Sequence, residues 1–204
     1  MTRGADASLS FNEIEALATK AARGAGLGWG HAEDLGRGAR WLAERGLNWS
    51  GPLLRLLDSA DAAARLTSTM QTADRASSAI QGECWTTEGD ADPVYLVPLL
   101  AASIYGRDIG LALRWPGLTM RIASEGSASA SHAPIDLDDV QGPLTIEGMA
   151  DTDALAHAVS QVARPAAVPS TVHASLSIYA GKTAVPASAA SRTRGAGSTR
   201  SDND

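Results

Sequence analysis

Between residues 9 and 46 the sequence carries the pattern of two short helices joined by a glycine-rich turn. Ser10 and Glu13 form a capping box, the signature with which a helix begins. Apolar side chains then recur at every third or fourth position, and Gly24 and Gly26 supply a stop. A second apolar stripe runs from about residue 32 to residue 45. We therefore expect a helical hairpin at the start of the fold.

The composition favours closely packed helices in this part of the chain. Aromatic residues make up only 4% of the sequence, so Ala and Leu must fill the interior, and Ala is also the best helix former. Ser50 as a cap and Pro52 in a first turn predict a third helix. Residues 61–92 show weak periodicity and predict a helix followed by a loop that carries Cys84 and Trp85.

The clearest β pattern is IGLALRW, then PG, then LTMRIAS, over residues 109–124. Apolar and other residues alternate on both sides of PG, which fits the central pair of a turn, so we expect a hairpin of two strands. Arg114 and Arg121 then project from the face opposite the apolar one. PLTIEGM, residues 143–149, predicts a third strand of a small antiparallel sheet.

The rest of the chain predicts further helices and an arm. PVYLVPLLAASIYG, from residue 93, predicts a buried helix begun by Pro98, although PVYLV also fits a short strand. Residues 151–165 predict a capped amphipathic helix, and residues 170–181 fit either a strand or a helix. We expect an α+β fold: one domain over residues 1–183, helical at about 8–68 and mixed at about 92–183, with C-terminal helices and an arm or tail at 184–204.

The C-terminal segment 184–204 is polar and rich in small residues. Its composition is typical of a disordered tail, because it cannot bury enough apolar surface to offset the entropy lost on ordering. Our alternative hypothesis is an extended arm that contacts another subunit or covers a pocket. Arg192, Arg194 and Arg200 are the candidate partner-binding residues of this arm.

The charge pattern limits the partners. The net charge is −6, and the fifteen Arg and two Lys are scattered, whereas nucleic-acid binding needs clustered positive charge. One cysteine excludes a disulfide within the chain and a cluster of thiolate metal ligands. The start has no apolar signal region, and no stretch reaches the ~18 apolar residues of a membrane span. We expect a cytoplasmic protein that binds neither nucleic acid nor membrane.

Two resemblances follow from these segments. SFNEIEALATKAARGAGLGWGHAEDLGRGARWLAERGL, YLVPLLAAS and the ending VPASAASRTRGAGSTRSDND resemble an uncharacterised bacterial family of unknown function, which implies a helix before VPAS and no known activity. The first hairpin is similar to the start of the malate and lactate dehydrogenases of the non-Rossmann type. There an Arg-Gly pair leads to a catalytic histidine. Here Arg45 and Gly46 lead to LNWSG, so no dehydrogenase residue is transferred.

Several residues have side chains suited to catalysis. Cys84 is a nucleophile only if the fold brings a base to it, and His31 or His132 would be that base. A lone cysteine is more commonly a small buried apolar residue, and Glu83 beside it would raise the thiol pKa. The run SHAPIDLDD offers oxygen ligands, but its spacing departs from known calcium loops, so we expect a solvated turn and no metal.

The β hairpin carries the most suggestive group. Arg114 and Arg121 on neighbouring strands have the geometry to clamp a carboxylate or phosphate, and Trp115 on the other face is a candidate partner anchor. The simpler interpretation is a solvated outer face over an apolar inner one.

No catalytic constellation emerges, and no cofactor is implied. The leading expectation is therefore a binding or accessory subunit of a bacterial metabolic enzyme, in a homo-oligomer or bound to that enzyme. The alternative is an enzyme for a small anionic substrate, with a site assembled from the Arg, His and Cys residues named above. A deep pocket that unites them would favour the enzyme, and an apolar patch around Trp29, Trp41 or Trp49 would favour the subunit.

Overall fold

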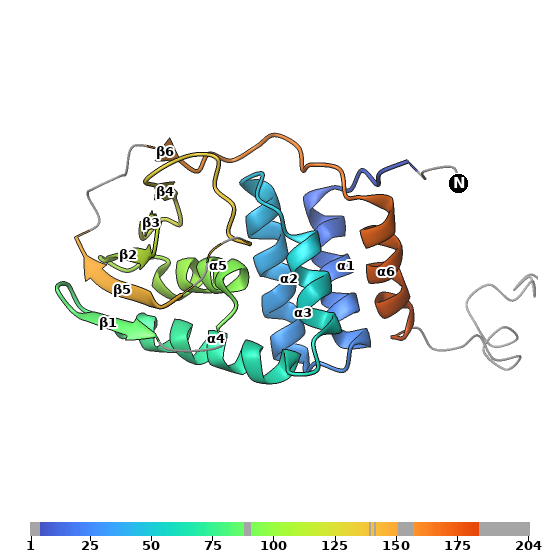
Figure 1. Cartoon of the computed structure of the whole chain (residues 1–204), viewed down its shortest axis with the longest axis horizontal. Coiled ribbons are helices and arrows are strands. Elements are labelled where there is room, and N and C mark those ends of the chain that lie inside the picture. Colours follow the sequence, from blue (N-terminus) through green and yellow to red (C-terminus); the bar gives the residue numbers. More distant parts are fainter. Residues whose placement is uncertain (1–4, 88–90, 139, 141, 151–156, 184–204) are drawn as a thin grey trace, which may run out of the picture.

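A computed structural model describes residues 5–87, 91–138, 140, 142–150 and 157–183. The expected α+β architecture is confirmed: helices lie side by side in one part, and an antiparallel sheet forms the other (Figure 1). The helices are α1 (Phe11–Gly24), α2 (Trp29–Glu44), α3 (Ser50–Asp58), α4 (Ala62–Ser77), α5 (Pro93–Ile104) and α6 (Ser170–Gly181).

The N-terminal hairpin forms as its sequence predicts. Both halves of the capping box are present at the start of α1, where the Ser10 backbone N–H donates to Glu13 Oε2 at 2.7 Å. The glycine-rich stretch is the turn between α1 and α2, with Gly26 at a φ of 96°. The third helix begins at Ser50, one residue earlier than expected, because Trp49 rather than Ser50 occupies the capping position.

Two glycines of α2 allow neighbouring helices to approach closely. A Cβ atom at Gly36 would lie 2.0 Å from Thr19 Oγ1 on α1, and one at Gly38 would lie 3.1 Å from Tyr95 Cδ1 on α5. At the end of α1, a Cβ at Gly24 would lie 1.7 Å from the carbonyl oxygen of Tyr179 on α6. The hairpin therefore packs between α5 and α6, with the backbones of α1 and α6 nearly in contact at Gly24.

The described strands are β1 (Cys84–Thr87), β2 (Gly110–Trp115), β3 (Leu118–Ile122), β4 (Ala128–Ala130), β5 (Leu144–Met149) and β6 (His157–Ala158). They form one sheet in the order β1-β5-β2-β3-β4-β6, with antiparallel pairing throughout. The expected hairpin is β2 and β3, with Gly117 at a φ of 85° in the turn. The loop expected around Cys84 and Trp85 is instead the edge strand β1.

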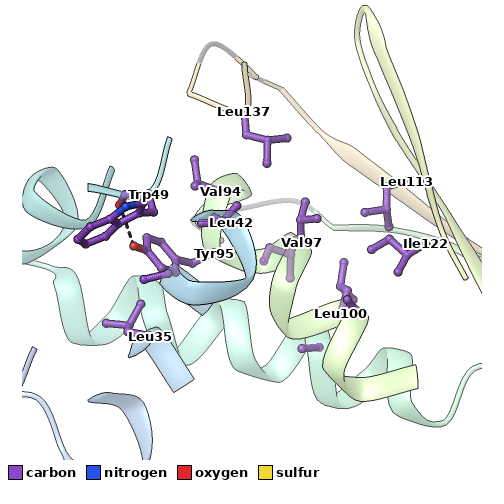
Figure 2. Packing of buried hydrophobic residues seen from close by; sticks show 14 of the residues in the cluster. Leu35, Leu42, Trp49, Val94, Tyr95, Val97, Leu100, Leu113, Ile122 and Leu137 are labelled. Carbon is purple, nitrogen blue, oxygen red and sulfur yellow. Dashed lines mark hydrogen bonds between the residues drawn. The ribbon is translucent and has the colours of Figure 1, made fainter. Parts of the chain in front are cut away.

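One cluster of buried side chains joins the helices to the inner face of the sheet. Val97 and Leu100 of α5 lie toward Leu113 and Ile122 of the sheet (Figure 2). On the other side of α5, the fully buried Tyr95 donates its hydroxyl to the carbonyl oxygen of Trp49 at 2.9 Å (Figure 2). Burial raises the pKa of this phenol well above its usual value. Helix α5 thus connects the two parts of the fold.

The start of α5 differs from the expectation. The helix begins at Pro93, with Pro98 inside it, because the side chain of Asp92 accepts from the N–H groups of Val94 and Tyr95 at 3.1 Å each. Burial raises the pKa of the Asp92 carboxyl. The Asp92 N–H donates to Thr69 Oγ1 of α4 at 2.9 Å, so this cap also fixes α4 against α5.

The helix expected at residues 151–165 is wrong for its described part. Residues 157–158 form β6 and residues 159–167 are not helical, whereas 151–156 lie outside the described residues. Backbone N–H groups of this segment bond to other elements instead of to a helix of their own. The Val159 N–H donates to Ala128 O at 2.8 Å, and the Val162 N–H donates to Glu44 O at 2.7 Å. Residues 170–181 do form a helix, the alternative that the family resemblance favoured.

The domain boundaries remain expectations. The helical part extends past residue 68, because α4 continues to Ser77. The segment 184–204 lies outside the described residues. None of the helices in the described ranges has the length and apolar character needed to span a bilayer.

Candidate functional site: a cleft between α2 and α5

A cleft of about 550 Å³ lies between α2 and α5 and is closed at one end by the turn at residues 125–126. Its size is that of small-molecule sites in proteins, about 300–1,000 Å³. The residues that line it are Asp34, Arg37, Gly38, Trp41, Glu44 and Arg45 of α2 and its cap, Pro98, Leu99, Ala101, Ala102 and Tyr105 of α5 and its cap, and Glu125, Gly126 and Gln161.

Helical spacing brings the α2 residues to one face. Asp34, Arg37, Trp41 and Glu44 follow one another at three or four positions, which places them along one stripe of a helix. Gly38 lies in the same stripe, and its missing side chain leaves room for α5. The larger side chains of this stripe therefore form the α2 wall of the cleft.

Arg45 forms the most constrained part of the wall. Its side chain is only 7% exposed, and the guanidinium lies over the ring of Trp41 at 3.8 Å from the centroid. Nη2 donates to the carbonyl oxygen of Gly126 at 2.8 Å, and Nη1 donates to that of Trp41 at 3.2 Å. The nearest carboxylate oxygen that pairs with it, Glu44 Oε2, is 3.9 Å away, and burial lowers the pKa of Arg45.

The contacts of Arg45 explain how α2 ends here. The Arg45 N–H donates to Leu42 O, one residue short of the helical partner, Trp41 O. The Arg45 side chain supplies the donor that Trp41 O lacks. The same guanidinium reaches the turn after β3, so it fixes that turn against the carboxyl end of α2.

The remaining ionisable groups of the cleft lie nearer to solvent. Arg37 is 63% exposed and bonds to Asp34 at 2.5 Å, and Arg40 Nε bonds to Glu44 Oε1 at 2.8 Å. Tyr105 is 71% exposed and lies at the mouth, 3.8 Å from where a Cβ of Gly126 would be. The mouth therefore has an aromatic edge and charged groups that retain contact with water.

A second, shallower groove adjoins the cleft across Arg37. It lies between α1 and α2 and is lined by Asn12, Glu15, Ala16, Thr19, Lys20, Trp29, Glu33 and Arg37. Trp29 is 65% exposed, with the guanidinium of Arg23 at 4.7 Å from its ring centroid. Of the three tryptophans expected to mark a patch, Trp29 is exposed, Trp41 is half-buried in the cleft, and Trp49 is buried.

The fold does not gather the predicted catalytic residues at this cleft. His31 lies in the first turn of α2, Cys84 is exposed on the edge strand β1, and His132 follows β4 with its Nδ1 at 3.2 Å from Ser131 Oγ. None of these three side chains lines the α2–α5 cleft or the groove between α1 and α2.

Arg114 and Arg121 share the outer face of the sheet, as their alternation predicts. Pairing of Ala112 with Arg121 and of Arg114 with Thr119 puts the two arginines diagonally across β2 and β3. Arg114 bonds to the carboxylate of Glu147 on β5. Glu147 thus already supplies, from within the chain, the carboxylate that a ligand would have brought to Arg114.

The expected partner anchor Trp115 packs inside the core with 6% exposure, and a buried side chain presents no surface to a partner. Alternation explains this, because Trp115 faces the same side as Leu113. The arm residues Arg192, Arg194 and Arg200 lie outside the described residues.

Asp136 and Asp138 of the acidic run near His132 are held by a local hydrogen bond and by an ion pair to α3. Asp136 Oδ1 accepts from the Asp138 N–H at 2.9 Å, and Asp138 bonds to Arg55 of α3 at 2.5 Å. Within the described ranges, no three His, Cys, Asp or Glu side chains are grouped so that they could hold a metal ion.

Sequence reasoning missed the cleft. Its residues come from segments around 34–45, 98–105 and 125–126, and no local motif links them. Two signals in the sequence pointed toward it: the spacing of Asp34, Arg37, Trp41 and Glu44 along one helix, and the Arg-Gly pair after that helix, to which the resemblance to the dehydrogenases gave no role here.

Comparison with known proteins agrees with the first resemblance. No curated protein and no solved structure matches the chain. Residues 9–81, which contain α1 to α4, match the model of a family described as "Protein of unknown function (DUF3726)". The match includes the opening pattern and ends before YLVPLLAAS. Residues 9–81 thus match an uncharacterised family of unknown function, the kind of family that the opening helices resemble.

Proposed function

We propose that the chain is a ligand-binding accessory subunit, which holds a small molecule in the α2–α5 cleft and serves a partner enzyme. The observation that carries this proposal is the cleft itself, where the half-buried Trp41, the exposed Tyr105 and the buried Arg45 meet around about 550 Å³. An apolar surface with a few oriented polar groups is the usual composition of a small-molecule site.

The residue types in the cleft support binding rather than covalent chemistry. The described residues that line it include no His, Cys, Ser, Thr or Lys, so the nucleophile-and-base pairs of acyl transfer cannot be assembled from them. The enzyme hypothesis needs a pocket that unites two or more of its candidate residues, which are Arg114, Arg121, His31, His132 and Cys84. None of them lines a cleft that we describe.

Trp29 supports the accessory part of the proposal. Tryptophan and arginine contribute much of the binding energy at protein interfaces, and Trp29 is exposed beside Arg23 and Arg37 in the groove next to the cleft. A second copy would bring another net charge of −6, which opposes self-association, so the partner that fits is an enzyme with a basic surface. We place this assembly in the bacterial cytoplasm.

Native mass spectrometry of the chain, purified gently from cells that also make its partners, tests the proposal with three matched variants. Tyr105→Ala should lose a retained small molecule, and Trp29→Ala should lose a stoichiometric second polypeptide. Ile178→Ala removes a side chain that is 68% exposed on α6 and should lose neither. A ligand or partner that survives in its own variant, or that disappears equally in Ile178→Ala, contradicts the assignment of these surfaces.

A further inference from the structure

We infer that the ligand of the α2–α5 cleft is an organic cation, an amine or quaternary ammonium compound with an apolar body. This inference rests on the proposed function of the cleft. It differs from the small anion that the sequence led us to expect.

The first argument is that the guanidinium groups of the cleft are already engaged. Arg45 donates to two backbone carbonyl groups and is covered by Trp41, so it does not present its charge to the opening. Arg37 is held by Asp34. Arg45 Nε has no hydrogen-bond partner, but it is buried, so a ligand in the cleft does not reach it. An anion at Arg37 would also meet the carboxylate of Asp34, which repels it.

The second argument is the balance of charge in the lining. Among the lining residues, Asp34, Glu44 and Glu125 contribute three carboxylates, against the two guanidinium groups of Arg37 and Arg45. Asp34 pairs with Arg37, and Glu44 pairs with Arg40, which lies outside the lining, so Glu125 is the carboxylate left for a ligand. Glu125 is exposed at the turn that closes the cleft, and the hydroxyl of Ser127 donates to it. A carboxylate has about four acceptor sites, so this single bond leaves room for an ammonium group.

The third argument is the direction of the two helices. Arg45 and Tyr105, the carboxyl-terminal caps of α2 and α5, both line the cleft. The carboxyl end of a helix carries a partial negative charge of about half a unit, which favours a nearby cation.

The fourth argument is the aromatic wall. Arg45 covers one face of the Trp41 ring, and Tyr105 is exposed at the mouth. Aromatic rings attract ammonium groups through their electron-rich faces, and they also pack against an apolar body. Leu99 and Ala102 extend this apolar surface along α5.

Three compounds of similar shape and different charge test the inference: phenethylamine, phenethyl alcohol and phenylacetate. Titration calorimetry with the whole chain should give the tightest binding for the amine and the weakest for phenylacetate. Glu125→Gln should weaken the amine about two- to five-fold, the effect of one exposed charge, and leave the alcohol unchanged. Glu33→Gln, a carboxylate of the adjoining groove, is the matched control and should change neither.

The outcomes separate the two proposals. If phenylacetate binds best, or if Glu125→Gln weakens the amine and the alcohol equally, the cation inference is wrong and a ligand cleft remains. If no compound binds, and Tyr105→Ala also leaves retention of native small molecules unchanged, both the inference and the proposed function fail.

Discussion

Replacing Arg45 with methionine should destabilise the protein, even though the substitution removes a charged group that is buried away from water. Methionine keeps most of the length of the stem and removes the guanidinium. The carbonyl oxygens of Trp41 and Gly126 then lose their donors, which lie at 3.2 and 2.8 Å in the native chain.

The expected loss follows from three contributions. A buried polar group left without a partner costs about 1–3 kcal/mol, and two carbonyl groups are affected. Loss of the stacking on Trp41, at 3.8 Å from the ring centroid, adds about 1 kcal/mol. Burial lowers the pKa of Arg45, which shows that burying this charge costs free energy. The methionine variant avoids that cost, so part of the loss in stability is offset. We expect a net loss of about 2–4 kcal/mol, or about 4–16 °C in Tm for a chain of this size.

Urea unfolding followed by circular dichroism measures this loss, with Arg37→Met as the control. Arg37 is 63% exposed, and its pair with Asp34 should be worth less than about 1 kcal/mol. Arg45→Lys should lie between native and Arg45→Met, because a lysine can reach one carbonyl group but cannot stack as a plane. A loss below about 0.5 kcal/mol for Arg45→Met, or equal losses in Arg45→Met and Arg37→Met, would refute the reasoning.

Three further predictions concern the packing of the helices. Gly24→Ala puts a Cβ 1.7 Å from Tyr179 O, so α6 should separate from α1. Hydrogen-exchange measurements should then show much faster exchange of the amide hydrogens of residues 170–181. Gly28→Ala, with no atom within 4 Å of its Cβ, should not have this effect. Tyr95→Phe should cost about 1–2 kcal/mol in urea unfolding, because Trp49 O loses its buried donor; an unchanged midpoint would show that water replaces the phenol. Burial raises the pKa of Asp92, so its contribution to stability is present at low pH and is lost as the pH rises through the folded pKa. Urea unfolding should therefore show Asp92→Asn gaining stability relative to native as the pH rises above the ordinary pKa of the carboxyl, 3.8; a gain by native instead would contradict this sign.

Local signals determined the elements that the sequence predicted well. Helix α1 needs only Ser10, Glu13 and an apolar stripe, all within a few turns of one helix. The β2–β3 hairpin needs only alternation and a Pro-Gly turn, and alternation also decides that Arg114 faces outward while Trp115 faces the core. In each case the residues that interact are near neighbours in the chain, so the pattern and the contact coincide.

Tertiary structure decided what local patterns left open. Residues 157–164 belong to a segment predicted as an amphipathic helix, but their backbone groups bond to the edge of the sheet and to the end of α2. The cleft depends on Arg45 reaching Gly126, which is 81 residues away, and on Gly38 admitting α5. A buried charge is tolerated only where the fold supplies hydrogen-bond acceptors for it. The spacing of residues in the sequence does not show which distant carbonyl group will lie beside Arg45.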